Sequence, residues 1–434
     1  MNWKQLISNK RLGQEELHIR RKDDRTEFKR DYDRLIFSAP FRRLQNKTQV
    51  FPLPGSIFVH NRLTHSLEVA SVGRSLGDDV ARQLLAKHPE LADTHLSEIG
   101  SIVSAACLAH DLGNPPFGHS GERAIASYFK EGDGQPYQKM MTEAEWSDVT
   151  HFDGNANAFR LLTHTFEGRR KGGFVMTYST LAAIVKYPYP STQAGKKQKF
   201  GFFQSEQEDY MKIAEELGLG LCCRHPLVYL VEAADDICYE IMDIEDAHKL
   251  RLLTTDETKE LMLGFIAAEH HERVKEVFNH VTDTNEQIVY LRSSAIGTLE
   301  RECVKTFVEH EHEILDGRFE GSLIKHVSPV IREAYERCQD VSLRKIYRSK
   351  DVLDIELAGY RIISQLIDLF TEAAMHPERE YSKLLLARVS SQYEVDADTP
   401  YARIMAVLDY ISGMTDVFAL DLYRKINGES LPMI

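Results

Sequence analysis

A histidine–aspartate pair at the end of an apolar run is the strongest chemical signal in the chain. Residues 105–122 read AACLAHDLGNPPFGHSGE, so His110 and Asp111 follow an apolar helical run and precede a stiff Gly-Asn-Pro-Pro loop. Such a pair can bind one metal ion if other parts of the chain supply further ligands. His65 in RLTHSLEVA and Asp235 in EAADDICYE are the candidates. Two imidazoles and two carboxylates form a mixed nitrogen and oxygen site suited to Mn, Fe, Ni, Zn or Mg.

Each of these four residues has an ordinary alternative explanation. A single histidine in a helix is more often a hydrogen-bonded core or surface residue than a ligand, and His-Asp pairs occur by chance. The four lie together on strongly apolar helices, however, where an unpaired charge is costly. A buried carboxylate needs a cation or several donors, and a metal ion provides the cation. Four protein ligands leave positions open on an octahedral ion, which indicates catalysis rather than a structural site.

A second pair of polar residues follows the loop. His119 lies nine residues after His110, and Glu122 lies three residues later in the first turn of the next predicted helix. Residues at that spacing share a helical face, so Glu122 can orient His119 as a proton-transfer pair. Equally, Glu122 can be a first-turn acid that interacts with the helix dipole. The residues alone do not decide between the two, and His151 in HFDGN is a weaker candidate for the same region.

Several residues near the candidate ligands are of types that bind nucleotides. Arg62 precedes His65 by three residues and can reach a phosphate or form a surface salt bridge. Tyr239 and Asp243 follow Asp235 by four and eight residues, on one helical face. The tyrosine can stack on a sugar and the aspartate can hold a donor, although Tyr239 also suits a core position.

Two lysine-containing segments follow in the middle of the chain. Lys186 ends a predicted helix and can contact phosphate. The lysine-rich run of residues 195–199 is more typical of a solvated loop than of a binding patch.

Helical spacing of apolar residues dominates the chain, and alternating β-type runs are scarce. Residues 30–44 also show helical spacing, although Pro40 must distort or end a turn. We predict a loop with a short extended piece, KTQVFPL, at residues 45–62, irregular structure at 131–153 and a mobile loop at 187–203. The predicted helices are 64–87, 98–111, 121–130, 154–166, 175–186, 205–217, 225–249, 256–270, 272–281, 286–311, 324–338, 351–374, 378–388 and 400–427. This pattern predicts an all-α single fold whose C-terminal third packs as a helical extension.

Composition narrows the class of protein. The 434 residues carry 53 basic and 66 acidic side chains, a net charge of −13, which argues against a broad DNA-coating surface. We find no apolar run of the roughly 20 residues that a membrane span needs, and the N-terminus lacks the apolar core of a signal peptide. The six cysteines form no CxxC pair, so we expect reduced thiols in a cytoplasmic protein without a membrane partner.

The motifs together resemble a known family. In chain order they are RRLQNKTQVFPL, NRLTHSLEVA, AHDLGNPPFGHSGE, HFDGNANAFRLL, VKYPYPS and EAADDICYEIMDIEDA. This set is similar to the deoxyguanosine triphosphate triphosphohydrolases (dGTPases) of the HD-domain superfamily. The resemblance covers roughly residues 25–250 and extends more loosely through ELAGYRII and DYISGMTDVFALDLYRKI. It implies an α-helical HD-domain fold, with a phosphohydrolase core and N-terminal extension at residues 1–250 and a helical region packed on it at 251–434.

The resemblance also implies roles for particular residues. The metal ligands of the family map onto His65, His110, Asp111 and Asp235, and its catalytic histidine and glutamate map onto His119 and Glu122. Its glutamine that contacts the sugar 3′-hydroxyl corresponds to Gln49. The remaining substrate-binding candidates are Arg62, His151, Lys186, Tyr187, Tyr239 and Asp243. Asp153 stands where the usual motif has a glutamate.

The activity implied by the resemblance is metal-dependent hydrolysis of a deoxynucleoside triphosphate (dNTP), with dGTP preferred, to deoxynucleoside and tripolyphosphate. The family also implies a homo-oligomer, often a hexamer, and a nucleotide or single-stranded DNA effector. One alternative keeps the metal site for other substrates, such as nucleoside monophosphates or cyclic or alarmone nucleotides. Another is a non-catalytic nucleotide sensor or nucleic-acid-binding scaffold, which the intact His-Asp set and the negative charge disfavour.

Overall fold

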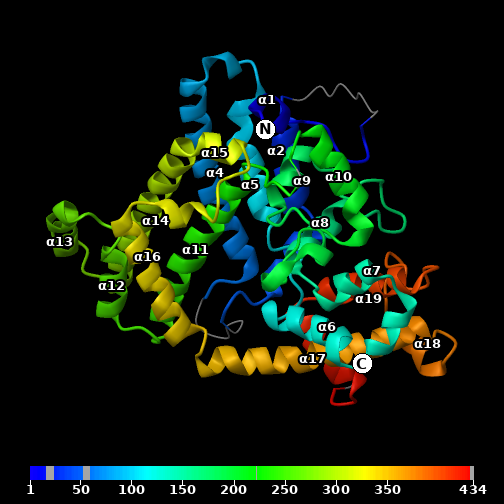
Figure 1. Ribbon diagram of the computed structural model, residues 1–434. Coiled ribbons are helices and arrows are strands. Elements are labelled where there is room, and N and C mark those ends of the chain that lie inside the picture. The colour runs from blue at the N-terminus through cyan, green and yellow to red at the C-terminus, as the bar shows by residue number, and fades with distance from the viewer. Residues whose placement is uncertain (16–23, 52–58, 221, 431–434) are drawn as a thin grey trace.

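Helices account for the regular structure of the molecule (Figure 1). A computed structural model describes residues 1–15, 24–51, 59–220 and 222–430. Within these ranges the chain forms no β-sheet and only isolated bridges, one of which joins Thr48 to Asn61. The predicted all-α class is confirmed. The α-helices are Trp3–Leu6 (α1), Glu27–Ile36 (α2), Ala39–Arg43 (α3), Arg62–Lys87 (α4), Ile99–Ala109 (α5), His119–Glu131 (α6), Glu143–Thr150 (α7), Gly154–Thr163 (α8), Tyr178–Ile184 (α9), Gln207–Glu216 (α10), Val228–Lys249 (α11), Thr255–Leu263 (α12), His271–His280 (α13), Thr284–Glu309 (α14), Glu311–Leu315 (α15), Pro329–Val341 (α16), Lys350–Met375 (α17), Glu380–Leu386 (α18), Pro400–Ser412 (α19) and Asp416–Ile426 (α20).

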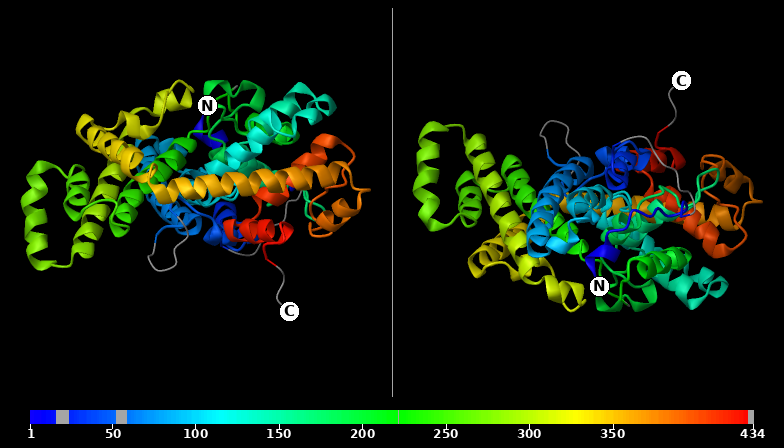
Figure 2. Two further views of the ribbon diagram at one scale, coloured as in Figure 1. Left: turned by 90° about the horizontal axis from the view of Figure 1, so that it is seen from below. Right: turned by 90° about the horizontal axis from the view of Figure 1, so that it is seen from above.

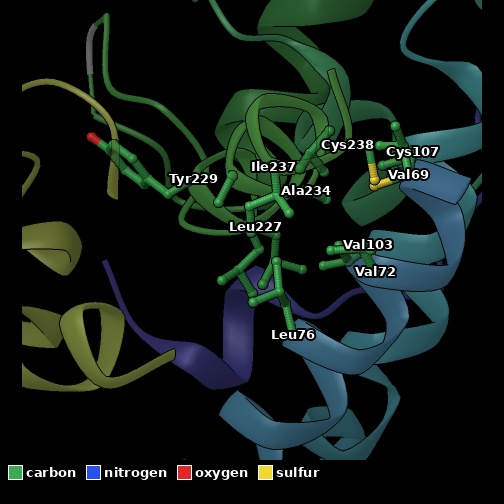
Figure 3. Close-up of a cluster of buried hydrophobic side chains, with 14 of the residues drawn as sticks. Val69, Val72, Leu76, Val103, Cys107, Leu227, Tyr229, Ala234, Ile237 and Cys238 are labelled. Carbon is green, nitrogen blue, oxygen red and sulfur yellow. The ribbon is translucent and has the colours of Figure 1, made fainter. Parts of the chain in front are cut away.

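The α4, α5 and α11 helices share the core that positions the candidate site (Figure 3). α4 and α5 approach closely because glycines meet at their contact, where a Cβ on Gly77 would lie 2.6 Å from the Cα of Gly100. α11 packs against both helices, and Val69, Val103 and Ile237 are fully buried among them. Complete burial of such a side chain contributes about 1.5–3 kcal/mol. The three helices that carry the candidate ligands are therefore packed firmly against one another.

A second hydrophobic cluster joins the C-terminal helices to the helix that follows the His110 loop. Ile125 and Phe129 of α6 pack in this cluster with Ile363 and Phe370 of α17. Seen from below in Figure 2, α17 runs across the molecule from the side of α16 to the end formed by α18 and α19. Helices after residue 250 thus share a core with helices of the first half. The domain boundary at residue 250 stays a prediction.

Two segments contain helix boundaries that the sequence prediction missed. Residues 131–153, predicted to be irregular, include α7, which begins with a capping box between Thr142 and Glu145. The capping pattern was readable, but the polar composition of the segment obscured it. The predicted helix 400–427 is two helices, because the side chain of Thr415 caps a new helix.

The remaining differences are smaller. Residues 30–44 divide into α2 and α3, because Ser38 caps α3 and Pro40 lies in its first turn. Residues 187–203 lack an α-helix and contain only short 3-10 turns. The end of the predicted extended piece, Pro52 and Leu53, lies outside the described residues. Among the helices that the structure describes, none has the length and apolar character that a membrane crossing requires.

Candidate functional site

Four side chains from three helical segments converge at the C-terminal end of α5. The Nε2 atom of His65 lies 3.1 Å from Oδ1 of Asp235, and the Nε2 atom of His110 lies 3.5 Å from the same oxygen. The two imidazole rings are 5.4 Å apart between centroids. Ligand atoms of His65, His110 and Asp111 all lie within 4.8 Å of one another. The structure therefore brings together the four residues that the sequence singled out as metal ligands.

Local backbone structure fixes where the two histidines lie. The side chain of Asn61 caps α4 in a capping box with Thr64, so His65 lies in the first turns of a stable helix. α5 ends at Ala109, and a turn follows that carries His110 and Asp111. Gly113 lies so close to α8 that a Cβ there would be 2.1 Å from the amide nitrogen of Ala158. A glycine is required at this position because any side chain would push the turn away from α8.

The His110 ring is oriented to bind a ligand through Nε2. Its Nδ1–H donates to the carbonyl oxygen of Cys107 at 2.6 Å, and Nε2 is buried without a hydrogen-bond partner within the described residues. A backbone acceptor on the opposite ring nitrogen is typical of metal-binding imidazoles. Burial lowers the pKa of His110, but the charges of Asp111 and Asp235 outweigh burial and raise it to about 9. Excess carboxylate charge beside an unsatisfied Nε2 fits a divalent cation.

Two neighbours hold the Asp111 carboxylate in place. The NH1 group of Arg62 donates to Oδ2 of Asp111 at 2.7 Å, and the side-chain Nδ2 of Asn114 donates to Oδ1. Arg62 is itself buried, so this ion pair is not the surface salt bridge considered from sequence. Gly118, at φ +55°, lies against the guanidinium, where a Cβ would be 2.6 Å from NH2. Asn114 was not predicted to hold Asp111, although its position in the Gly-Asn-Pro-Pro loop was a usable signal.

His119 and Glu122 form a hydrogen-bonded pair at the start of α6. Nδ1 of His119 lies 2.8 Å from Oε2 of Glu122, and Oε1 of Glu122 accepts from the Gly154 N–H at 2.7 Å. The His119 side chain is 73% exposed, whereas that of Glu122 is 9% exposed. Burial raises the pKa of Glu122, but the hydrogen bond and charge of His119 and the charge of Lys199 outweigh it and hold the pKa at about 2. Glu122 is thus an ionised acceptor that orients the His119 ring.

Lys199 reaches this pair from the lysine-rich loop. Its Nζ lies 3.5 Å from Oε2 of Glu122 and 3.5 Å from Oδ2 of Asp153. The sequence favoured a solvated loop here, but the Lys199 side chain is only 29% exposed. The prediction failed for this residue because Lys199 and Glu122 are 77 residues apart in sequence and no local pattern reveals their contact.

The outlying substrate-binding candidates lie in varied surroundings. The amide oxygen of Gln49 is buried and has no hydrogen-bond partner within the described ranges. Lys186 forms an ion pair with Glu232 at 3.0 Å. The ring of Tyr187 faces the guanidinium of Arg224, 5.9 Å from the ring centroid. The Nδ1–H of His151 donates to the Ser147 carbonyl at 2.9 Å, within its own helix end. The substrate roles of these residues stay predictions.

Tyr239 and Asp243 continue the face of α11 that begins with Asp235. The Tyr239 ring lies 6.4 Å from that of His65 and 6.0 Å from that of Tyr347. The Tyr347 hydroxyl donates to Oδ2 of Asp243 at 2.8 Å. Burial raises the pKa of Asp243 well above its usual range, and the hydrogen bond from Tyr347 opposes this effect. The sequence analysis did not single out Tyr347, which lies 104 residues from its partner.

The loop that carries the second histidine is held by residues from the end of the fold. Asp416 accepts from the Phe117 N–H at 2.9 Å and from the Thr48 N–H at 2.7 Å. Lys47 donates to the carbonyl oxygens of Asn114 at 2.6 Å and Ser412 at 2.8 Å. Phe117 has a φ of +61°, which is strained for a bulky residue. These hydrogen bonds hold the loop in that conformation.

Comparison with known proteins identifies the class to which this arrangement belongs. A family model described as "HD domain" matches residues 62–171, and one described as "Phosphohydrolase-associated domain" matches residues 325–425. The HD match contains three of the four convergent residues, and α11 supplies the fourth, Asp235, from outside it. The chain is therefore an HD-domain protein of the phosphohydrolase class.

Full-length relatives narrow the class to a family. The chain is 37% identical over 446 residues to a deoxyguanosinetriphosphate triphosphohydrolase-like protein of Pseudomonas aeruginosa, with 100% of both chains covered. It is 37% identical over 453 residues to a protein of the same name from Synechocystis, covering 99% of this chain and 100% of the relative. It is 30% identical over 477 residues to a deoxyguanosinetriphosphate triphosphohydrolase of Yersinia enterocolitica, with 92% and 93% covered. The chain belongs to the deoxyguanosinetriphosphate triphosphohydrolase-like family, as its motifs predicted.

Proposed function

We propose that the protein is a metal-dependent dNTP triphosphohydrolase that converts dGTP and water to deoxyguanosine and tripolyphosphate. The convergence of His65, His110, Asp111 and Asp235 from separate helices carries this proposal. The adjacent His119–Glu122 pair and the names of the full-length relatives support it.

The four convergent residues would hold a divalent cation, of which Mn, Mg, Fe, Ni and Zn all suit the donor set. Such a cation supplies a water molecule of lowered pKa and polarises a phosphoryl oxygen. Arg62 and Asn114 orient the Asp111 carboxylate, and the Cys107 carbonyl orients the His110 ring. These partners hold the donor atoms in place before any ligand binds.

We assign to His119 the proton transfer that the reaction requires. Its Nδ1 is committed to Glu122, so Nε2 is the nitrogen that can face a substrate. In the proposed step a water oxygen bonds to the α-phosphorus, the bond to the 5′-oxygen breaks, and His119 delivers a proton to that oxygen. The attacking water gives up one proton to the solvent, and His119 takes a proton from the solvent before the next turnover. Proton transfer by a positioned histidine contributes about 100- to 10,000-fold to a rate.

The remaining candidate residues suit the other parts of a dNTP. We assign Lys186, Lys199 and Arg62 to the triphosphate, although each also pairs with a carboxylate in the structure. Gln49, Tyr239 and Asp243 are placed in our proposal at the deoxyribose, where Tyr239 walls the 2′ carbon. Tyr187 and His151 complete the proposed substrate contacts. Assembly as a homo-oligomer, such as a hexamer, and an effector site for nucleotides or single-stranded DNA stay predictions from the family.

Product analysis tests the proposed reaction. Purified protein is incubated with each of the four dNTPs and with GTP, in Mn²⁺ or Mg²⁺ and in EDTA, and products are separated by ion-exchange chromatography. We expect deoxyguanosine and tripolyphosphate from dGTP only when metal is present. Release of dGMP or dGDP would show that a different bond is cleaved, and preferential hydrolysis of monophosphates would favour another HD phosphohydrolase activity.

A further inference from the structure

Asp148 of α7 is a buried carboxylate to which the proposed mechanism gives no role. Its Oδ1 accepts from the Ser191 hydroxyl at 2.6 Å, and its Oδ2 accepts from the Gln204 N–H at 2.7 Å and from the Tyr401 hydroxyl at 2.6 Å. Ser191 and Gln204 are the two ends of the loop that carries Lys199. Tyr401 belongs to α19, which lies beside α7 in Figure 1. One carboxylate therefore joins both ends of the loop to the helices around it.

The chain between these two ends is closed on itself at its base. The Gly201 N–H donates to the Tyr189 carbonyl at 3.1 Å, and Pro190 and Phe202 form an isolated parallel bridge. Phe200 is fully buried in the hydrophobic cluster that contains α17 and α19. A compact loop whose ends lie together has little backbone freedom left, because closure restricts the conformations open to it.

The two sides of the loop differ in what they contact. The Phe200 ring lies 5.4 Å from that of Phe203 and faces the hydrophobic cluster. Nζ of Lys199, the preceding residue, lies 3.5 Å from Oε2 of Glu122. The same oxygen lies 2.8 Å from Nδ1 of His119. An opposite charge this close favours the ionised form of Glu122, so the loop supplies a charge to the acceptor that orients His119.

The tip of the loop depends on its ends for its position. Between the buried residues Ala194 and Phe200, the tip residues Gly195, Lys196 and Gln198 are exposed to solvent. Burial raises the pKa of Asp148 to about 6, although the hydrogen bonds that it accepts oppose this effect. Above that pH the carboxylate is ionised and can accept from all three of its donors.

We propose that Asp148 is a positioning residue that holds the loop of residues 191–204 closed, so that Lys199 stays against the His119–Glu122 pair. This inference rests on the proposed dNTP hydrolysis, in which that pair moves a proton, and extends it to a residue that acts through Lys199. No motif singled out Asp148, because it lies in the segment of residues 131–153 that was predicted to be irregular.

A double-mutant cycle at about pH 8, above the pKa of Asp148, tests the inference. Asp148→Asn keeps the size of the side chain and removes its charge, and it is made in the wild-type protein and in the Lys199→Met variant. We expect kcat/KM for dGTP to fall about 10-fold in each single variant. The double variant should also lose about 10-fold, because both substitutions remove the same charge from Glu122. Losses that multiply to about 100-fold would overturn the positioning role.

Ser191→Ala and Tyr401→Phe form a matched pair, because each removes one hydroxyl that donates to Asp148 at 2.6 Å. Only Ser191 lies in the loop. We expect kcat/KM for dGTP to fall about 5-fold in Ser191→Ala and less than about 2-fold in Tyr401→Phe. Equal losses in the two variants would show that Asp148 only stabilises the fold, and would overturn the inference even where Asp148→Asn does not fold.

Limited proteolysis adds a readout that does not depend on activity. Trypsin cleaves a folded chain where the backbone opens locally. We expect cleavage within residues 195–199 to be about 10-fold faster in Asp148→Asn than in the wild-type protein. Cleavage at the exposed residues 169–171 should keep the wild-type rate, and an equal rise at both places would indicate general unfolding and overturn the inference.

The two readouts separate this inference from the proposed function. Wild-type hydrolysis of dGTP combined with unchanged loop cleavage in Asp148→Asn refutes the inference alone. Absence of dGTP hydrolysis by the wild-type protein refutes the proposed function and, with it, the effect of Asp148 on catalysis, whatever the proteolysis shows about the loop.

Discussion

Two groups of histidine and carboxylate side chains join the start of α4 to α11, one of them together with the turn after α5, and their geometry differs in one decisive way. His60, just before α4, meets Asp246 through Nδ1 at 2.8 Å and Glu68 through Nε2 at 3.1 Å. Each ring nitrogen therefore has its own carboxylate. In the other group, His65 and His110 direct their Nε2 atoms at one oxygen of Asp235.

Convergence of ligand atoms on one point, rather than residue type, distinguishes the proposed metal-binding group from a structural ion pair. Burial lowers the pKa of His60, but the hydrogen bonds and charges of Asp246 and Glu68 raise it to about 10. Both ring nitrogens of His60 are thus engaged by its two acids, whereas Nε2 of His110 has no hydrogen-bond partner among the described residues. Substitutions in and around the two groups test whether they differ in metal binding.

The largest effect is expected from His110→Ala. Loss of a converging nitrogen weakens metal binding, so dGTP hydrolysis should fall by roughly 1,000-fold or more, and metal content measured by mass spectrometry should fall with it. EDTA should abolish wild-type activity, and added Mn²⁺ should restore it. His60→Gln is the control, because it changes a buried histidine on the same helix pair and should retain bound metal. Equal metal loss in both variants would contradict the contrast.

The second-largest effect is expected from a substitution that impairs proton transfer but leaves metal binding intact. Glu122→Gln removes the ionised acceptor that orients His119, and kcat should fall by roughly 100-fold. Metal content should stay at the wild-type level. If Glu122 were only a first-turn acid, the variant would instead lose a few tenths of a kcal/mol of stability and keep its kcat.

His60→Gln should cost stability rather than chemistry. We expect a loss of about 2 kcal/mol in the free energy of unfolding near neutral pH, because the variant loses charge-assisted hydrogen bonds. The folded-state pKa of about 10 lies above the ordinary value of 6.5. The contribution of His60 is therefore fully present below pH 6.5 and is lost as the pH rises toward 10. Urea unfolding of both proteins at several pH values should show this difference shrink; a constant difference across that window would refute the pairing.

The smallest effect is expected at the loop lysine beside Glu122. Lys199→Met removes the cation that lies 3.5 Å from both Glu122 and Asp153, and kcat/KM should fall about 10-fold. Lys196→Met is the control, since Lys196 is an exposed residue of the same loop. A matching loss in the control would mean that the general charge of the loop, and not the position of Lys199, is responsible.

The contrast between the two histidine groups also marks the limit of prediction from sequence. His65, His110, Asp111 and Asp235 were predicted because polar residues on apolar helices are conspicuous and fall in recognisable motifs. His60 and Asp246 have the same residue types on the same helices, and only their geometry assigns them to an ion pair.

Long-range contacts set the second limit. Asn114 could be predicted to hold Asp111 from its place in the loop. Lys199, Tyr347 and Asp416 could not, since each meets the site across 77 to 299 residues of chain. Most helices were predictable from apolar spacing, whereas α7 and the break before α20 depended on the caps at Thr142 and Thr415.

The hydrogen bonds that Asp416 accepts from the backbone of Thr48 and Phe117 affect when, during synthesis of the chain, the protein can become active. The motifs that contain His65, His110 and Asp111 are translated early in the chain, yet the backbone of Phe117 finds its carboxylate partner only 299 residues later. A ribosome-bound chain that has already folded α4 and α5 would still lack this restraint on the loop. Competence to turn over substrate would therefore be acquired late in synthesis, after the hydrophobic centre is complete.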